Sequence, residues 1–439
     1  MLNKTEAQGL VKAITALTQY YALVSISQTS QGTTRFANSE ISQNILIEEG
    51  RISLTLFDGK KQATSATNDF SKTGLETLVK NAEATLQYVP EGEFGAFPFS
   101  TAPVAEKTPS TALLASFDTA ARASYIKEGV ALLEDGFTAS GALVLLDTVT
   151  ILGDSEAGFR YANYQSVAFN TVVTHTSGAD GAGECISYNS SPDVLGCFKK
   201  AMATAKAALD PVEPTLGGLT VVLSPTAFGD LVSFVTNSLN AKGVQDGYSF
   251  AVGKLGQKIF GDNITITDDV THPDLLPLTF DAEGNPKKAL ALIENGVIKN
   301  YVYDNKRAQK DGVETTGHAI VTRWYQGAIP TNIVVAPGTS SVEDMIKSTA
   351  CGVFVNEFHY TNFVNPRTLQ VTGLTRNGTF MIEDGKLTKP LTNARFTESL
   401  LDAFCNITEI SQERELVSGF GAALVPGVKI ENFHFTSKS

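Results

Sequence analysis

The sequence predicts an α+β protein in which two similar units of helices and strands precede a half that is dominated by strands. The first observation is an internal repeat, because the tetrapeptide RFAN at residues 35–38 recurs as RYAN at residues 160–163. The second is that a helical pattern opens and closes the unit around each copy. The third is a series of short strand-like segments, separated by Asn-Gly and Asp-Gly turns, after residue 216. Antiparallel strands flanked by helices are typical of the α+β class.

The first unit, residues 1–88, is predicted to run α-β-β-β-β-α. We expect its opening helix at residues 5–18 and its closing helix at 71–86, where Ser71 or Thr73 suits the N-cap position. The four strands between them are expected at residues 22–27, 33–38, 44–49 and 51–57.

The second unit, residues 115–209, is predicted to repeat this order. Its helices are expected at residues 117–134 and 192–208, the latter begun by Ser191 and Pro192. Its strands are expected at residues 142–152, 159–163, 166–175 and 183–188. Residues 89–114 hold several prolines and few periodic apolar positions, which predicts a linker. Together the units form a predicted N-terminal domain, residues 1–212, with antiparallel sheets.

Residues 213–439 are predicted to form a β-dominated, barrel-like domain. A strand at 219–223 leads into a helix that extends to about residue 240, with Ser224 as N-cap and Pro225 in the first turn. Further helices are expected at residues 340–348 and 396–404. The Asn295-Gly296 and Asp384-Gly385 pairs favour type I′ hairpin turns.

Composition limits the function classes. A net charge of −12 and the lack of a basic run argue against nucleic-acid binding, which needs clustered Lys and Arg. The sequence contains no run of 18 consecutive apolar residues, so it predicts no membrane span. The first 18 residues indicate an amphipathic helix rather than a signal peptide. The four dispersed cysteines indicate free thiols in a reducing compartment, so we expect a cytoplasmic protein.

The familiar catalytic motifs are missing. The chain has no dinucleotide fingerprint, no P-loop and no nucleophile elbow. No two of its five histidines lie within four residues of each other, which excludes a helical zinc-binding pair. A metal site assembled from the distant residues His318, His359 and Glu357 is the remaining alternative.

Polar clusters provide candidate peptide-binding residues. In a strand, Glu357 and His359 share one face, and Arg376 is placed to pair with Glu357 or to bind a peptide carboxylate. Asn362 belongs to the same polar stretch, and His318 ends a second, glycine-containing cluster. For each cluster, a structural network or a tight loop is the alternative to a ligand surface.

The RFAN tetrapeptide adds two further candidates. Arg35 and Asn38 are predicted either to line a substrate surface or to serve a structural role. In the structural alternative, the aromatic residue packs inward and the asparagine closes a turn.

Several stretches resemble the signatures of the TldD/PmbA family, the so-called modulators of DNA gyrase. They occur in the family's order along nearly the whole chain, at residues 35–44 (RFANSEISQN), 304–318 (DNKRAQKDGVETTGH), 358–364 (FHYTNFV), 372–383 (TGLTRNGTFMIE) and 384–406. The resemblance implies a cytosolic protease that acts on unfolded peptides, often as a pair of one zinc-bearing and one metal-free subunit.

The resemblance also implies where zinc would bind. Active members carry His-Glu-x-x-x-His on a central helix, with a cysteine of the C-terminal domain as a further ligand. By position the motif falls here on Val232, Ser233 and Asn237, and the helix contains no histidine. Cys351 is in the region of the ligand cysteine but preserves no motif. We therefore expect the PmbA/TldE-like branch, with no metal, no catalytic residue and no cofactor in this chain.

Three functions follow as hypotheses. The first is a metal-free subunit that binds unfolded peptide and pairs with a zinc-bearing TldD-like protein, in which case only the partner would hold zinc. The second is an autonomous homodimeric peptidase with a relocated site. The third is a non-enzymatic regulatory protein linked to DNA gyrase, which the net charge of −12 disfavours.

Overall fold

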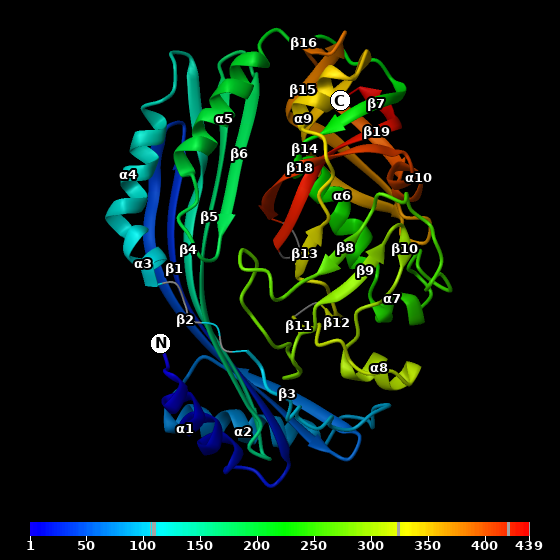
Figure 1. Cartoon of the computed structure of the whole chain (residues 1–439). Helices are drawn as coiled ribbons and strands as arrows, with labels where there is room; N and C mark the ends of the chain where they lie inside the picture. The colour runs from blue at the N-terminus through cyan, green and yellow to red at the C-terminus, as the bar shows by residue number, and fades with distance from the viewer. Residues whose placement is uncertain (106, 108–110, 323–324, 419–421, 439) are drawn as a thin grey trace.

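The computed structural model describes residues 1–105, 107, 111–322, 325–418 and 422–438. Its N-terminal part is one long antiparallel sheet of six strands in the order β3-β2-β1-β4-β5-β6 (Figure 1). The first unit supplies β1 (Tyr21–Ala37), β2 (Glu40–Asp58) and β3 (Lys61–Thr67), and the second supplies β4 (Phe137–Asp154), β5 (Phe159–His175) and β6 (Asp180–Ser187). Strands β1 and β4 pair along their length and join the two units into a single sheet.

The predicted repeat is present, but each unit is α-β-β-β-α, with three strands instead of four. The segments predicted as two strands at 22–27 and 33–38 are both part of β1, and those at 44–49 and 51–57 are both part of β2. Strand β3 was not predicted. The polar residues 28–32 resemble a break in sequence, but β2 and β4 pair with them on both sides and keep them extended.

The RFAN and RYAN tetrapeptides do not occupy equivalent positions. RFAN ends the first strand of its unit, whereas RYAN begins the second strand of the other unit. Asn38 closes the turn between β1 and β2 with a left-handed φ of 50°, and Phe36 packs inward against Phe198. These positions match the structural alternative, and a role of Asn38 in substrate binding stays a prediction.

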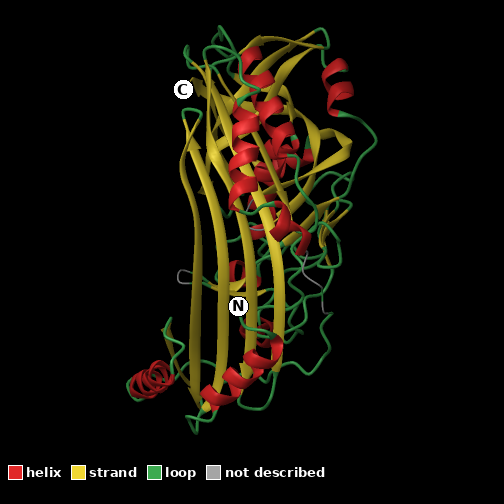
Figure 2. Cartoon of the chain, turned by 90° about the vertical axis from the view of Figure 1, so that its left-hand side faces the viewer, coloured by secondary structure: helices red, strands yellow, loops and turns green. Residues whose placement is uncertain are grey.

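Helices cover the outer face of the long sheet at its two ends (Figure 2). At one end, α1 (Lys4–Thr15), capped by Asn3, and α2 (Lys72–Leu86), capped by Ser71, pack on a core that includes Ile52, Leu54 and Ile151. At the other end lie α3 (Thr111–Ser116), α4 (Thr119–Val130) and α5 (Val194–Ala207). The middle of this face lies between the two groups of helices.

Five strands of the C-terminal part close into a ring, which confirms the predicted barrel-like form. They are β7 (Gly217–Leu223), β14 (Cys351–Asn365), β15 (Gln370–Glu383), β17 (Ala394–Ser399) and β19 (Ala422–Lys438), and β19 pairs back with β7. Phe358, Phe396 and Phe433 pack together, with ring centroids 4.4 Å apart for Phe358 and Phe396. Alternation of side chains along each strand directs these rings to the same face of the sheet.

The remaining strands extend this sheet or form a separate hairpin. They are β8 (Ile266–Asp268), β9 (Leu290–Glu294), β10 (Val297–Ile298), β13 (Asn332–Val335), β16 (Lys386–Pro390) and β18 (Ile407–Ser418), with β11 (Ala319–Val321) and β12 (Gln326–Ala328) as the hairpin. Both predicted Gly-containing turns have the left-handed backbone of a hairpin, with φ of 49° at Asn295 and 48° at Asp384.

The helices of this part are shorter than predicted. They are α6 (Pro225–Asn237), α7 (Ala241–Gln245), α8 (Asn305–Asp311), α9 (Val342–Lys347) and α10 (Leu400–Cys405). The helix predicted at 396–404 is wrong in its first half, because residues 394–399 pair as β17 with β15 before the chain turns into α10. Among the described residues, no helix is long and apolar enough to cross a membrane.

Candidate functional site

Helix α6 and the strands beside it enclose the first candidate site, a cavity of about 20 Å³. Ser224 fixes the start of the helix by accepting a hydrogen bond from the backbone N–H of Ala227. Val232, Ser233 and Asn237, the three positions assigned to the metal motif, all line this cavity, and Ser418 of β18 lines it from the opposite side. We call it the α6 pocket. It has room for about one water molecule.

The residues of the α6 pocket do not fit a zinc ion. Zinc in proteins is bound by histidine nitrogen, cysteine thiolate or carboxylate oxygen, and none of the described residues that line the pocket supplies one of these. Valine offers only hydrocarbon, and serine and asparagine are neutral oxygen donors. Across the part of the chain that the structure describes, no group of three or more His, Cys, Asp or Glu residues is placed to hold a metal ion.

Cys351 does not line the α6 pocket. It begins β14, is exposed and faces Glu383 of β15. Ser418 of β18, with Ala422 and Ala423 of β19, lines the pocket from the C-terminal strands. Sequence reasoning missed Ser418 because its position depends on how β18 pairs with β19.

The second candidate site is a group of charged residues between the long sheet and the barrel. Glu357 of β14 faces Arg376 of β15 across the strand pair, and Asn377 donates from Nδ2 to Glu357 Oε2 at 2.7 Å. Asp180 and Glu184 of β6 lie on the other side of this junction, where their charges interact with Arg376 and Glu357 respectively. We call these five residues the junction cluster.

Burial and like charges shift the carboxyl groups of this cluster. Burial, together with the neighbouring Glu357 carboxylate, raises the pKa of Glu184 to about 7. Burial likewise raises the pKa of Glu357, although Asn377, Arg376 and His359 oppose the shift. Both carboxyls therefore keep their protons to a higher pH than exposed glutamates do.

Close contacts hold the junction together. Lys200 of α5 forms an ion pair of 3.3 Å with Glu415 of β18. Gly378, with a φ of +113°, approaches Thr204 of α5 so closely that a Cβ atom would lie 2.5 Å from Thr204 Cγ2. The structure thus brings three predicted residues, Glu357, His359 and Arg376, to a contact between the two parts of the chain.

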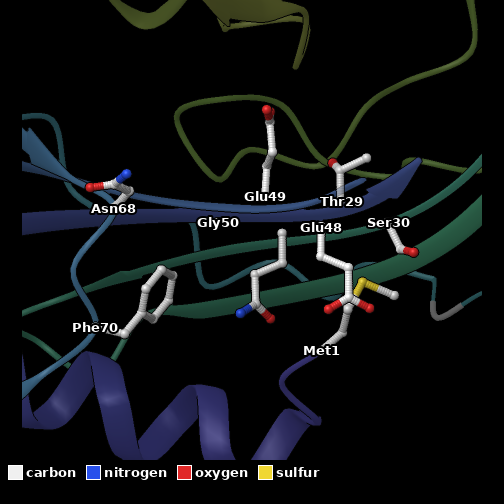
Figure 3. Close-up of a pocket in the computed structure, with 9 residues that line it drawn as sticks. Met1, Thr29, Ser30, Glu48, Glu49, Gly50, Asn68 and Phe70 are labelled. Atoms are coloured by element: carbon white, nitrogen blue, oxygen red, sulfur yellow. The ribbon is translucent and has the colours of Figure 1, made fainter. Parts of the chain in front are cut away.

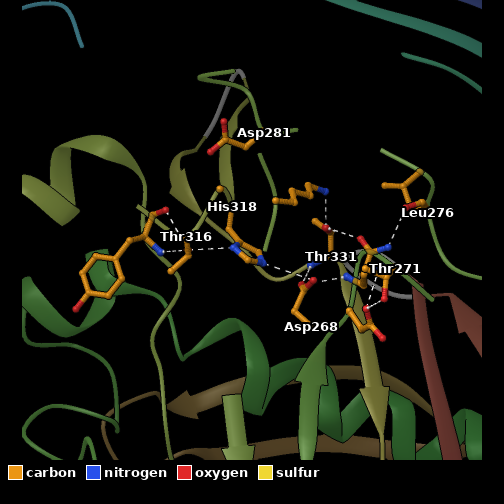
Figure 4. Close-up of polar contacts among 12 residues, drawn as sticks. Asp268, Thr271, Leu276, Asp281, Thr316, His318 and Thr331 are labelled. Carbon is orange, nitrogen blue, oxygen red and sulfur yellow. Dashed lines mark hydrogen bonds and ion pairs between the residues drawn. The ribbon is translucent and has the colours of Figure 1, made fainter. Parts of the chain in front are cut away.

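His318 lies elsewhere, in a buried polar network (Figure 4). It is 1% exposed, its Nε2 faces Asp268 Oδ1 at 3.5 Å and its Nδ1 lies 3.0 Å from Thr316 Oγ1. Asp268 uses its second oxygen to accept from the backbone N–H groups of Thr331 and Asn332. The structure does not join His318 to Glu357 and His359, and a role of His318 in peptide binding stays a prediction.

The three other predicted residues are accessible. Asn362 is exposed near the tip of the β14–β15 hairpin, where its Nδ2 donates to the backbone oxygen of Tyr360. Asn38 lies exposed at the β1–β2 turn. Arg35 faces Ala142, which faces Asn170, which in turn faces Glu184. Because directly paired residues share a face, Arg35 lies on the same inner face of the long sheet as Glu184.

A larger open pocket of about 220 Å³ lies on the long sheet and is lined by residues of β1 and β2 together with Met1, Asn68 and Phe70 (Figure 3). Glu48 contributes the carboxylate labelled beside Met1, and the Phe70 ring covers Gly50. The starts of α1 and α2 are close by, since Asn3 and Ser71 are their N-caps. No residue predicted as functional lines this pocket.

Sequence reasoning missed Asp180, Glu184 and Asn377. Asn377 precedes a glycine in the Asn-Gly pair at 377–378, a signal for irregular backbone that the structure confirms with a φ of 53°. Asp180 and Glu184 lie an even number of residues apart on one strand, which places them on one face. Nothing in the sequence shows that this face meets β14 and β15.

Comparison with known proteins gives a consistent result. A family model described as "PmbA/TldA metallopeptidase C-terminal domain" matches residues 216–437, and one described as "PmbA/TldA metallopeptidase domain 1" matches residues 22–86. An uncharacterized protein of Methanocaldococcus jannaschii is 29% identical over 58% of this chain and 61% of its own length. A metalloprotease TldD homolog of Haemophilus influenzae is 28% identical over 51% of this chain and 47% of its own length. The chain thus matches about half to three-fifths of the length of these relatives.

The fold is shared along the whole chain with a solved structure. The crystal structure of TldE from Thermococcus kodakarensis superimposes with a TM-score of 0.87 over 97% of this chain and 99% of that chain, at 20% sequence identity.

Proposed function

Because the chain belongs to the PmbA/TldD family of metallopeptidases, we propose that it is a metal-free subunit that binds unfolded peptides and acts together with a zinc-bearing family member. The observation that carries this proposal is the chemistry of the α6 pocket. Val232, Ser233, Asn237 and Ser418 meet there, and none supplies a nitrogen, thiolate or carboxylate ligand. A family member without these donors cannot activate water on a metal at that position.

Peptide binding is supported by the polar groups along the inner face of the long sheet and at the junction. Arg35 and Glu184 lie on that face, and His359 and Arg376 are exposed beside Glu357. Extended chains expose one N–H and one C=O per residue, so polar side chains of both signs suit a segment of undefined sequence. We assign Asn362 and Asn38 to the same surface, and we place the protein in the cytoplasm.

The proposal is tested by two measurements on the purified full-length protein. Zinc content is measured by mass spectrometry after dialysis, and cleavage of an unfolded peptide is followed with and without a zinc-bearing TldD-like relative. We expect less than stoichiometric zinc, no cleavage by the chain alone, and cleavage that increases above that of the relative when both are present. Stoichiometric zinc in the pure chain would refute the proposal.

An autonomous homodimeric peptidase is the alternative that the junction cluster favours, since three of its carboxyls, Asp180, Glu184 and Glu357, have raised pKa values and His359 lies beside Glu357. This alternative predicts cleavage by the pure chain that His359→Ala abolishes and His272→Ala leaves unchanged. A regulatory protein linked to DNA gyrase would instead give a salt-sensitive DNA complex in a gel-shift assay, which a net charge of −12 opposes.

A further inference from the structure

The junction cluster holds more acidic than basic groups. Its five residues are Asp180, Glu184, Glu357, Arg376 and Asn377, so three carboxyl groups share one guanidinium. Strand β6, which carries the first two of these residues, contacts β15 and β18 of the C-terminal part (Figure 1). The cluster therefore joins the two parts of the chain and keeps negative charge that no group within it neutralises.

The basic groups around Glu184 do not supply the missing positive charge. Lys200 of α5 acts on Glu184, but its ammonium forms an ion pair of 3.3 Å with Glu415 of β18, which acts on Glu184 with the opposite sign. Arg35 shares the face of Glu184 but lies three strands away, at about 4.8 Å per strand, which is too far for an ion pair.

Asn377 lies between the carboxyl groups and has an acceptor left over. Its backbone N–H donates to the Asp180 carboxylate, and its Nδ2 donates to Glu357 Oε2 at 2.7 Å. The residue is 4% exposed, and its Oδ1 has no hydrogen-bond partner among the described residues. Buried acceptors usually have a donor, so an unpartnered oxygen among carboxylates indicates a site that a donor from outside the chain completes.

The ionisation of the cluster points to the same missing group. Burial, together with the Glu357 carboxylate, raises the pKa of Glu184 to about 7, and burial raises the pKa of Glu357 against the opposing effects of Asn377, Arg376 and His359. A cation between the two glutamates would attract both ionised carboxylates and offset their repulsion. Both glutamates are half-buried rather than enclosed, so a ligand group can reach them.

We propose that the junction cluster holds the positively charged side chain, Lys or Arg, of a bound peptide, and that the protein therefore selects basic segments. This inference rests on the proposed peptide binding and names the chemical class of the peptide. A lysine ammonium has three donors and an arginine guanidinium has five, so either can donate to Glu184 and Glu357 together. The net charge of −12 acts in the same direction, because it attracts cationic chains.

A divalent metal ion fits the cluster less well than a side chain. Such ions need several oxygen ligands around one point, and no three acidic, histidine or cysteine side chains of the described residues are placed in that way. Arg376 would also repel a doubly charged ion from Glu357. A lysine or arginine brings its charge on a flexible apolar stem and needs only two carboxylates.

The test compares peptides that differ at one residue. A labelled unfolded peptide with a single central Lys is titrated with the full-length protein, and fluorescence anisotropy gives its Kd beside those of the Arg, Gln and Glu versions. We expect the Lys and Arg peptides to bind about tenfold or more tightly than the Gln peptide. The Glu peptide should bind more weakly than the Gln peptide, because it meets carboxylates of the same sign.

Variants locate the preference on the cluster. Glu184→Gln should bring the ratio of the Lys and Gln affinities close to one, and Glu357→Gln should act in the same way. Glu76→Gln is the matched control, because it removes the same charge from an exposed position of α2, on the opposite face of the long sheet. This variant should keep the wild-type ratio. Circular dichroism checks that each variant is folded.

The affinity for the Lys peptide should also depend on pH. A bound cation favours the ionised form of Glu184, whose pKa in the free protein is about 7 because of burial and the Glu357 charge. Glu184 must therefore lose its proton for the peptide to bind, and the affinity should fall about tenfold from pH 8 to pH 6. The fall should be smaller for Glu184→Gln and for the Gln peptide.

The outcomes separate this inference from the proposed function. Equal binding of the Lys, Gln and Glu peptides would overturn the inference and leave peptide binding standing. A preference for Lys that survives in both Glu184→Gln and Glu357→Gln would overturn it as well, because another site would then carry the preference. Displacement of the Lys peptide by calcium chloride, beyond that by sodium chloride of the same ionic strength, would assign the cluster to a divalent cation instead. If none of the peptides bound, both proposals would fail.

Discussion

Replacing His318 with leucine is expected to destabilise the protein rather than to remove a ligand contact. His318 and Asp268 are 1% and 0% exposed, and they face each other at 3.5 Å without another partner for His318 Nε2 or Asp268 Oδ1 among the described residues. Removing His318 leaves the buried Asp268 carboxylate without this neighbour, and an uncompensated buried charge costs about 3–5 kcal/mol. The free energy of unfolding falls by about 3 kcal/mol for each 1 M of urea, so this loss of stability lowers the unfolding midpoint by about 1 M or more.

The pH dependence of stability follows from Asp268. Burial raises the pKa of this carboxyl, but the hydrogen bond and charge of His318 and the charge of Lys287 hold it below the ordinary value. A carboxyl with a depressed folded pKa contributes stability above its unfolded pKa of about 3.9, and this contribution is lost as the pH falls through the folded value. We therefore expect the midpoint difference between wild type and Asp268→Asn to be constant near neutral pH and to shrink in acid.

Urea unfolding followed by circular dichroism measures these effects. The double variant His318→Leu/Asp268→Asn should be more stable than the sum of the two single changes implies, by about 1–3 kcal/mol. His359→Ala is the matched control, because this exposed histidine should change stability by no more than about 0.5 kcal/mol. If His318→Leu kept the wild-type midpoint and lost peptide binding, the structural interpretation of His318 would be refuted.

Three further predictions concern the sheet and the junction. Gly378→Ala should destabilise the contact between α5 and β15 by about 1–3 kcal/mol, because Gly378 has a φ of +113° and Thr204 lies close to it. Gly59→Ala is the control for the backbone contribution alone, because Gly59 has a φ of +58° but open space around it. The proteolysis rates of the two variants are compared. Arg122→Ala should lower the free energy of unfolding in urea by about 3 kcal/mol or more. The side chain is 1% exposed, and its guanidinium donates hydrogen bonds to Thr34, to the backbone oxygen of Phe117 and to Asn44. An unchanged unfolding midpoint would show that these bonds contribute nothing. Glu184→Gln should flatten the pH dependence of stability between about pH 4 and 7, because a carboxyl whose folded pKa is raised destabilises the fold as the pH rises through this window. Thermal unfolding at pH 5 and pH 8 measures the change. The same change of midpoint between these pH values in variant and wild type would contradict the prediction.

The candidate site divides into a part that sequence could predict and a part that it could not. Glu357, His359 and Arg376 were predicted from strand alternation, and the structure places them at one junction. Their neighbours Asp180 and Glu184 lie on β6, more than 170 residues earlier, and only the packing of the long sheet against the barrel brings them there. His318 was predicted from a separate, glycine-containing cluster, and the structure buries it beside Asp268, away from His359.

The sequence by itself determined the α+β class, the α6 helix with its Ser224 cap, the hairpin turns and the side chains of Val232, Ser233 and Asn237, none of which is a usual zinc ligand. These depend on local preferences and on the identity of single side chains, which no packing changes. The tertiary structure decided the length of the strands, because residues 28–32 are held extended only by partners on both sides. It also decided that the first half of β2 is an open edge and that Ser418 lines the pocket beside α6, since strand pairing joins distant segments whose contacts leave no local signal in the chain.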